Sequence, residues 1–225
     1  MTTKRRFFMN LLQAPLFRGL DRAELEEMHT CGCMRRALYE KNQVILHAGD
    51  TVRELGIVAS GRVNIESVDL WGNKSLLSDV PAGQVFAESY AWCGEPLMVD
   101  AVAAQDSEIF FLELSALNTC PHAAPWRDTL MRNLLSISVR KNLALTGRSF
   151  CTAPKSVRGR LLTYLSAQAV RAGSPSFQIP FDRQQMADYL NLDRSALSKE
   201  LGRMRDEGLL SFHKNCFTLK AQTSK

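Results

Sequence analysis

The sequence predicts an α+β protein: a region of short antiparallel strands, then a long helix, then a compact and mainly helical domain. Three observations lead to this prediction. Short apolar runs alternate with turn residues over the first half of the 225-residue chain. Apolar residues at helical spacing follow them, in a stretch without Gly or Pro. Finally, residues 147–225 hold 13 Lys and Arg against 6 Asp and Glu, a net charge of +7, whereas residues 1–146 hold 15 against 17. Such segregated positive charge favours a polyanionic partner for the C-terminal part.

The composition is that of a folded, water-soluble protein. Hydrophobic residues make up 45% and charged residues 23% of the chain, and no run of about 18 apolar residues is long enough to cross a membrane. Lys4–Arg6 followed by Phe7–Met9 superficially resembles a secretory signal, but Asn10, Gln13 and Pro15 interrupt the apolar run. We therefore expect a cytoplasmic protein with reduced cysteines and no membrane partner.

The first domain is expected to contain a helix at about Arg22 to His29 and then short strands. The apolar runs that predict strands are Val44–Leu46, Leu55–Val58, Val63–Ile65, Leu76–Leu77, Val85–Phe86, Ala101–Ala103 and Ile109–Leu112. Turn residues separate them, at Gly49-Asp50, Ser60-Gly61, Trp71-Gly72-Asn73 and Pro81-Ala82-Gly83. Regularly spaced short strands of this kind are typical of an antiparallel sandwich or barrel.

A long helix is expected from Pro125, a residue type favoured in the first turn, to Thr146, with Gly147 ending it. Its apolar residues form one broad stripe, which comprises Leu130, Met131, Leu134, Leu135, Ile137 and Leu145. Because this stripe is larger than a small β domain can easily cover, we expect a homodimer formed through it. The alternative is a helix that packs entirely on its own domain. After it, Thr152-Ala153-Pro154 is expected to begin the next helix.

The most informative segment predicts a helix-turn-helix. The first helix is expected over Asp182–Leu190 and the second begins at Arg194, with the turn Asn191–Asp193 between them. The buried side chains are expected to be Met186, Ala187, Leu190, Leu197, Leu201 and Met204. Gly208–Leu210 and Cys216–Leu219 then read as the hairpin of a winged helix.

In such a unit the second helix enters the DNA major groove and the first lies against the backbone. The expected DNA-binding residues are Arg183, Gln184, Asp193, Arg194, Ser195, Ser198, Lys199 and Lys214. Arg194 can bond a guanine with two parallel hydrogen bonds, whereas Arg183 and Gln184 are placed for phosphate contacts. Asp193 can also cap the second helix.

This arrangement resembles the CRP/FNR family of bacterial transcription regulators. The residues that carry the resemblance are Asp182–Leu201, the entry Ala14–Phe17 with Leu20, the turns Gly49-Asp50 and Ser60-Gly61, and Gly208–Leu210. The resemblance implies an effector-sensing β-roll (jelly-roll-like) in residues 1–124, a dimerisation helix and hinge in 125–150, and a winged helix-turn-helix in 151–225. It implies a homodimer on a palindromic promoter site in double-stranded DNA, with RNA polymerase as a candidate partner. Ser195 stands where the family commonly has Glu, so a different half-site is expected.

The resemblance also allows a test for a cyclic-nucleotide pocket. Members that bind the nucleotide have Gly-Glu-Leu and, about ten residues later, an Arg that neutralises the phosphate. Here Glu88 matches the glutamate, but Leu97 stands where the arginine is required. An unpaired buried phosphate is costly, so we do not expect cyclic AMP as the effector, unless Arg53 or Arg62 substitutes.

An unidentified small-molecule effector is expected instead, in a more apolar pocket suited to an organic metabolite or aromatic acid. Its expected lining is Glu88, Ser89, Trp92, Leu97, Met98, Val99, Leu145 and Thr146. The alternative is that these side chains simply fill the space.

We expect no bound metal, and the sequence does not indicate any particular cofactor. The cysteines do not match iron–sulfur or zinc spacing, and His29, His47 and His122 are only weak candidates for a haem ligand. A thiol–disulfide switch that joins Cys31 or Cys33 to Cys120 stays open. No Gly-rich phosphate loop, nucleophile elbow or metal-spaced cluster indicates an enzyme. A second alternative is a ligand-binding module that regulates a protein partner.

Overall fold

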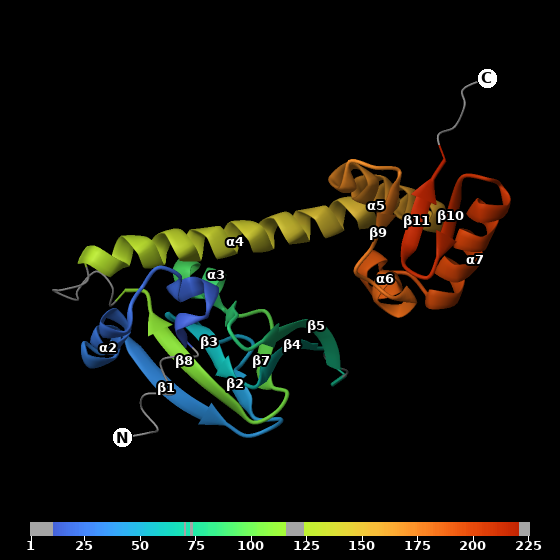
Figure 1. Ribbon diagram of the computed structural model, residues 1–225. Coiled ribbons are helices and arrows are strands. Elements are labelled where there is room, and N and C mark those ends of the chain that lie inside the picture. The colour runs from blue at the N-terminus through green and yellow to red at the C-terminus, as the bar shows by residue number, and fades with distance from the viewer. Residues whose placement is uncertain (1–10, 70, 73, 116–123, 221–225) are drawn as a thin grey trace. The chain divides into compact units, whose positions relative to one another are not determined.

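The computed structural model describes residues 11–69, 71–72, 74–115 and 124–220, and the chain divides into two compact units. Unit 1 is Met1–Arg140 and unit 2 is Lys141–Lys225. Helix α4 (Ala124–Thr152) contains the boundary between them (Figure 1). Cys120, named above as a possible disulfide partner, and His122, named above as a weak candidate for a haem ligand, lie outside the described residues. No helix of the described residues is both long and apolar enough to span a bilayer.

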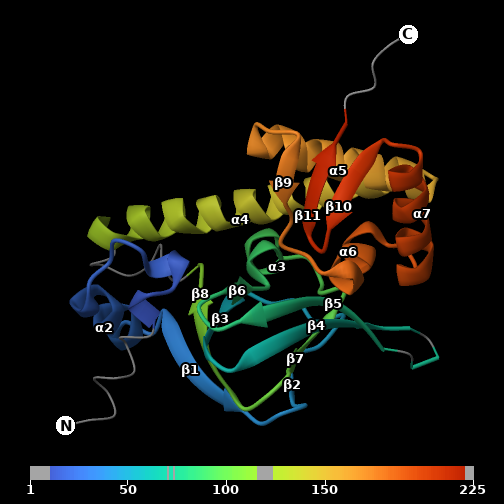
Figure 2. The same ribbon diagram turned by 45° about the vertical axis from the view of Figure 1, so that its right-hand side comes forward.

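Two antiparallel sheets form the described part of unit 1, as Figures 1 and 2 show. The first has the order β1-β8-β3-β6 and comprises Met34–Tyr39, Ser107–Glu113, Glu54–Ser60 and Val85–Phe86. The second has the order β2-β7-β4-β5 and comprises Val44–Leu46, Asp100–Ala103, Arg62–Val68 and Lys74–Pro81. Every apolar run predicted as a strand lies in one of these strands, so the predicted α+β fold with an antiparallel β domain is confirmed.

Strand β1 was not predicted. Its sequence, Met34-Arg-Arg-Ala-Leu-Tyr39, lacks a continuous apolar run, and half of its residues are exposed. It forms because it pairs in register with β8, from Met34 opposite Leu112 to Tyr39 opposite Ser107. Pairing with a strand far along the chain is a tertiary contact that a local pattern does not contain.

The first half of α4 packs on its own unit. Trp126, Leu130 and Leu134 are buried together with the 3₁₀ turn η1 (Pro15–Phe17) and helix α2 (Arg22–Thr30). The indole Nε1 of Trp126 donates to Glu27 Oε2 at 3.1 Å.

The assignment of Leu130 and Leu134 to a dimer interface was therefore wrong. Both side chains are at most 6% exposed and complete the core of unit 1. Met131 and Ile137 are partly buried against the same core. Leu135 and Leu145, in contrast, are 64% and 67% exposed.

Gly147 does not end α4, which continues to Thr152. A single Gly within a helix costs only about 1 kcal/mol, and the next turn carries Cys151, which is buried in the core of unit 2. The following helix, α5 (Val157–Ala172), begins later than predicted. Ser156 is its N-cap and accepts a hydrogen bond from Gly159 N at 3.0 Å.

Unit 2 is a winged helix-turn-helix. Helix α6 (Arg183–Leu190) begins within one residue of its predicted start and ends at the predicted residue, and helix α7 (Arg194–Asp206) begins at the predicted residue. Strands β9 (Ser176–Gln178), β10 (Leu210–His213) and β11 (Cys216–Leu219) form the antiparallel wing in the order β10-β11-β9. The predicted buried residues all lie in its core, namely Met186, Ala187, Leu190, Leu197, Leu201 and Met204.

Replacing Gly61 with Ala is expected to destabilise unit 1 by about 2–5 kcal/mol. Gly61 has a φ of +88° in the turn between β3 and β4, and an added Cβ would lie 2.3 Å from Ser107 Oγ and 2.6 Å from Asp106 O. Ser107 is buried and hydrogen bonds Arg62 N and O, so it cannot move aside without losing those bonds.

The measurement is urea unfolding followed by tryptophan fluorescence, because all three tryptophans lie in unit 1. Gly49→Ala is the matched control, since Gly49 has a φ of +91° but no atom within 4 Å of an added Cβ. Equal losses of stability in the two variants would contradict the steric account.

Candidate nucleic-acid interface and effector cavity

The N-terminus of α7 is organised by Asp193. Its Oδ1 accepts hydrogen bonds from Ser195 N at 2.8 Å and Ala196 N at 3.0 Å, and from the Ser195 hydroxyl at 2.5 Å. The bond from the Ser195 hydroxyl is the main cause that lowers the pKa of Asp193, followed by the two backbone bonds. Asp193 therefore serves as the helix cap, and the hydroxyl proton of Ser195 is already directed to it.

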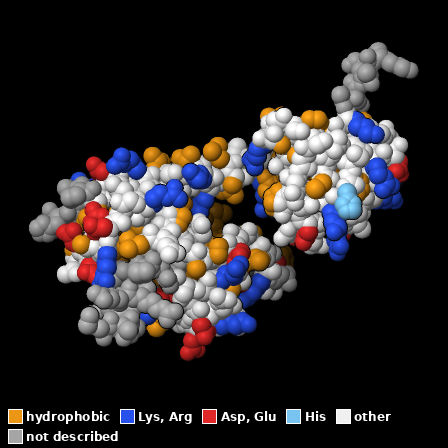
Figure 3. All heavy atoms as spheres, viewed as in Figure 1, with side chains coloured by type: hydrophobic (Ala, Val, Ile, Leu, Met, Phe, Trp, Pro, Cys, Tyr) orange, Lys and Arg blue, Asp and Glu red, His pale blue; other side chains and the backbone are white. Residues whose placement is uncertain are grey.

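One face of α7 is exposed and the other is buried. Arg194, Ser195, Ser198 and Lys199 are exposed, whereas Leu197 and Leu201 have no exposed area. Figure 3 shows Lys and Arg side chains gathered on the part of unit 2 that carries α7. The sequence analysis missed Arg203 and Arg205, which are also exposed on α7. Arg203 follows Lys199 by four residues, and that spacing could have indicated it.

Helix α7 is fixed to α5 by a network of charged side chains. Arg158 of α5 donates to Glu200 Oε1 at 2.5 Å and to both carboxylate oxygens of Glu207 at 2.7 and 2.8 Å. The hydrogen bonds from Arg158 lower the pKa of Glu207. This network attaches α7 to α5 within unit 2.

Arg183, at the start of α6, lies against the wing. Its guanidinium carbon is 4.9 Å from the ring centroid of Phe212 and 5.2 Å from that of Phe217. Desolvation by burial lowers the pKa of Arg183. Stacking on two aromatic rings fixes the direction of a side chain that would otherwise be flexible.

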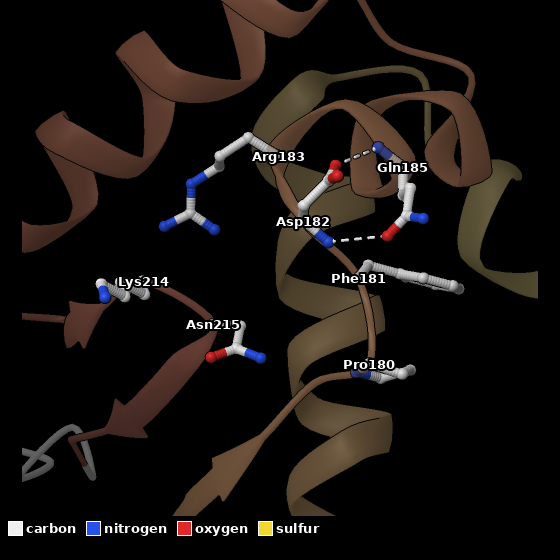
Figure 4. Close-up of a pocket in the computed structure, with 7 residues that line it drawn as sticks. All are labelled: Pro180, Phe181, Asp182, Arg183, Gln185, Lys214 and Asn215. Carbon is white, nitrogen blue, oxygen red and sulfur yellow. Dashed lines mark hydrogen bonds between the residues drawn. The ribbon is translucent and has the colours of Figure 1, made fainter.

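Arg183 and Lys214 line one pocket, which Figure 4 shows. The pocket has a volume of about 450 Å³ and lies between the N-terminus of α6 and the hairpin of β10 and β11. Lys214 occupies the hairpin tip with a φ of +52°. Asp182 and Gln185 close the end of α6 with a capping box, drawn as dashed lines in Figure 4. The pocket is therefore lined by two cationic side chains, Arg183 and Lys214, and by one carboxylate, Asp182.

The other end of α6 is held by two arginines that the sequence analysis did not single out. Arg148 of α4 donates to the carbonyl oxygens of Asp188 and Tyr189, at 3.0 Å each. Arg160 of α5 donates to Leu190 O at 3.2 Å and to Asn191 O at 2.8 Å. Cations at the C-terminal carbonyls of a helix stabilise it, and here they attach α6 to its neighbours.

A second site lies in unit 1, where helix α3 (Glu88–Cys93) runs beside α4 in both ribbon views. It is a mainly apolar cavity of about 490 Å³. Its lining residues are Glu88, Ser89, Trp92, Cys93, Met131, Arg132, Leu134, Leu135 and Ser138. Glu88 is buried at 6% exposure, and Ala87 before it has a φ of +59°, which turns the chain into α3.

Only some of the predicted pocket residues line this cavity. Glu88, Ser89 and Trp92 do. Leu97, Met98 and Val99 belong to the segment that leads into β7 and are not among its lining, and Met98 is 79% exposed.

Leu145 and Thr146 belong to unit 2 and do not line the cavity either. The part of α4 that lines the cavity ends at Ser138.

The cation that the sequence analysis missed is Arg132. It lies on α4 at the cavity, within the helical spacing of Met131, Leu135 and Ser138. Neither Arg53 nor Arg62 lines the cavity. Arg53 is exposed, and Arg62 is paired with Asp79.

Leu97 is buried and fixed by its backbone. Its N–H donates to Asp50 O at 2.9 Å, and its carbonyl accepts from Gly49 N at 2.7 Å. Its side chain is 5% exposed. The position that the family pattern reserves for a phosphate-binding cation therefore carries a buried alkyl group.

Helix α4 carries a row of exposed apolar side chains, the first of which, Leu135, also borders the cavity. We call Leu135, Val139, Leu143 and Phe150 the α4 stripe; they are 64%, 47%, 66% and 65% exposed. Their spacings of four, four and seven residues place them on one side of the helix. Figure 3 shows hydrophobic side chains along this edge of α4. Of the stripe, the sequence analysis named only Leu135.

The described residues contain no group of three or more His, Cys, Asp and Glu side chains that could hold a metal ion. His29 Nδ1 instead lies 3.1 Å from Met34 O at the start of β1.

Two domain families match the chain. Residues 36–121 match the cyclic nucleotide-binding domain, and residues 159–221 match the Crp-like helix-turn-helix domain. The chain is similar to the cyclic AMP receptor protein of Thermus thermophilus, with 28% identity over 206 residues, or 88% of either chain.

Solved structures give the same result. The fold is similar to that of the T. thermophilus catabolite activator protein, at 25% identity and a TM-score of 0.51 over 92% of this chain and 94% of that one. It is also similar in fold to CLP of Xanthomonas campestris, a c-di-GMP responsive global regulator, at 17% identity and a TM-score of 0.54. That alignment covers 90% of this chain and 100% of CLP.

Proposed function

Since the chain belongs to the CRP/FNR family of transcription regulators, we propose that it acts as a homodimer that binds a palindromic DNA site under the control of an organic effector. The observation that carries the DNA-binding part is α7. Its polar and basic face is exposed, while its apolar face is buried in a rigid domain. A recognition helix needs this division of its surface.

In this proposal Arg194 reads a base and Ser198 and Lys199 contact bases or phosphates in the same groove. The planar guanidinium of Arg194 suits the two acceptors of guanine, whereas the Lys199 ammonium supplies charge without planar recognition. Ser195 acts as an acceptor, because its proton is directed to Asp193. Arg183 and Lys214 together hold a backbone phosphate at the wing.

The homodimer forms through the α4 stripe. The stripe exposes large apolar side chains over about four helical turns, more than a monomeric surface helix usually carries. Pairing it with a second copy buries this surface and sets two recognition helices about one DNA turn, roughly 34 Å, apart.

The effector binds in the cavity between α3 and α4. The lining is apolar except for Glu88, the two serines and Arg132, so it favours an apolar organic molecule with an acidic group, such as an aromatic acid. Its acidic group would face Arg132. An effector can shift the DNA-binding equilibrium only if its affinity differs between the two arrangements of the dimer.

Cyclic AMP is not the proposed effector. In the family pattern the cation that pairs with the cyclic phosphate stands at the place of Leu97, which here is a buried alkyl side chain. Losing a charge-assisted contact to a buried phosphate costs several kcal/mol.

The test is selection from a randomised duplex pool with the full-length protein, at two salt concentrations, with and without cyclic AMP. We expect enrichment of a palindrome whose affinity falls steeply with salt, by a log–log slope of about −0.9 per phosphate contact. Cyclic AMP should leave that affinity unchanged. Enrichment only with cyclic AMP would overturn the argument from Leu97. A protein that binds DNA weakly and without salt dependence would instead be a module for a protein partner.

Arg183→Ala is expected to weaken binding to all duplexes alike and to reduce the salt slope by about 1. The reason is that Arg183 is placed for a phosphate rather than a base edge. Fluorescence anisotropy at several salt concentrations measures both quantities.

Arg183→Lys is the matched variant, because it keeps the charge but loses the stacking on Phe212 and Phe217. We expect it to retain the salt slope and to bind with intermediate affinity. A loss of affinity confined to particular sequences would contradict the assignment.

A further inference from the structure

The turn between α2 and β1 brings two cysteines into contact. Cys31 is the C-cap residue of α2, and Cys33 directly precedes β1. Gly32 between them has a φ of +78°, a left-handed conformation that glycine adopts without steric cost. The turn places Cys31 Sγ 3.0 Å from Cys33 Sγ. A disulfide bond is about 2.05 Å long, so the sulfurs need to approach by only about 1 Å.

The backbone on either side of the pair is held in place. Cys31 N donates to Glu27 O at 2.8 Å, within the last turn of α2. Cys33 O accepts from Glu113 N at 2.9 Å, at the end of β8. The two sulfurs are therefore brought together by the helix and the sheet rather than by a long loop.

The two thiols differ in access to solvent. Cys31 is exposed, whereas Cys33 is buried, with 2% of its surface exposed. An external reagent therefore reaches Cys31 first. Cys33 can react only with a sulfur that is already in contact with it.

We propose that Cys31 and Cys33 form a thiol–disulfide exchange site whose co-reactant is a low-molecular-weight disulfide such as oxidised glutathione. The Cys31 thiolate attacks one sulfur of that disulfide, forming a mixed disulfide and releasing one thiol. The Cys33 thiolate then attacks the Cys31 sulfur, closes the ring and releases the second thiol. Two protein thiols are oxidised, one external disulfide is reduced to two thiols, and the released thiolates take up both protons.

The site is part of the core that α4 covers. Cys33 belongs to the same buried cluster as Met28 of α2 and Trp126 of α4. Closing the ring moves one member of this cluster, so the packing beneath α4 responds to the oxidation state. The chemistry of the pair does not depend on DNA recognition, and its test does not use DNA.

The experiment treats the reduced full-length protein with oxidised glutathione, alkylates the remaining thiols with N-ethylmaleimide and maps tryptic peptides by mass spectrometry. Cleavage after Arg22 and Arg35 yields one peptide, residues 23–35, that contains both cysteines. We expect this peptide without label and two hydrogens lighter than its dithiol form. Reduction with dithiothreitol should restore two alkylation sites.

Single variants separate the two steps. Cys33→Ser should retain glutathione on Cys31, whereas Cys31→Ser should leave Cys33 unmodified because it is buried. Cys120→Ser is the matched control and should not change ring closure.

Two results would overturn the proposal. One is a wild-type peptide 23–35 with glutathione on Cys31, or with two alkylated thiols, in a sample where the exposed Cys216 carries glutathione. The other is a disulfide that joins this peptide to Cys120.

Discussion

Leu143→Glu is expected to convert the proposed dimer into a monomer and to lower the affinity for the proposed palindromic site by about 10²–10⁴-fold. Leu143 lies within the α4 stripe and is 66% exposed, so the change leaves the core of the monomer intact. In a symmetric dimer it would place two carboxylates in an apolar interface, without partners. In a dimer, binding of one winged helix to its half-site places the second winged helix at a high effective concentration near the other half-site. A monomer loses this gain in affinity.

The measurements are analytical ultracentrifugation and anisotropy with a palindromic and a single half-site duplex. Ala144→Glu is the matched control: it adds the same charge at the next residue, which is exposed and faces away from the stripe. We expect the control to remain dimeric. A Leu143→Glu protein that keeps the mass of two chains would exclude the α4 stripe as the dimer interface.

Arg194→Ala is expected to cost about 1–3 kcal/mol of specific binding and to abolish discrimination at one base position in each half-site. Arg194 is the first residue of α7 and is exposed, and the cap at Asp193 holds the backbone before it. Because a dimer carries two copies of Arg194, the loss applies in both half-sites.

The measurement compares the affinity for the selected site with the affinities for its single-base variants. Arg194→Lys tests planar recognition, since lysine keeps the charge but not the guanidinium fork. We expect it to lose most of the discrimination while keeping the salt slope. If Arg194→Ala weakened all sequences equally, Arg194 would be a phosphate contact and the assignment of the base-reading residue would be wrong.

Local signals were sufficient for the helix-turn-helix of unit 2. The start of α7 is determined by Asp193 and the turn before it by Asn191, which has a φ of +54° at the C-cap of α6. Caps and turns depend on residues within a few positions of one another, so the sequence reveals them directly. The apolar spacing then determines which face of each helix is buried.

Helix α4 could not be predicted as well. The sequence alone does not distinguish its buried residues from its exposed ones. Leu130 and Leu134, near its N-terminus, and Val139 and Leu143, near its centre, are all apolar and helically spaced. Only the packing of α2 and η1 separates the buried group from the exposed one. Gly147 likewise does not end α4. The next turn of the helix is stabilised by Arg148, which donates to Tyr189 O, and by Cys151, which is buried in the core of unit 2.

The sequence by itself determined the α+β organisation and the helix-turn-helix with its capped second helix, because each follows from residue type and short-range spacing; that Leu97 stands where a cation is expected is what the family resemblance implies. The tertiary structure alone decided which apolar face of α4 stays exposed, that Arg132 lies at the cavity beside α3, and that Cys31 touches Cys33. The first two depend on which surfaces other parts of the chain cover, and the third on the exact course of a turn between a helix and a strand. The local periodicity of the sequence predicts none of these three features.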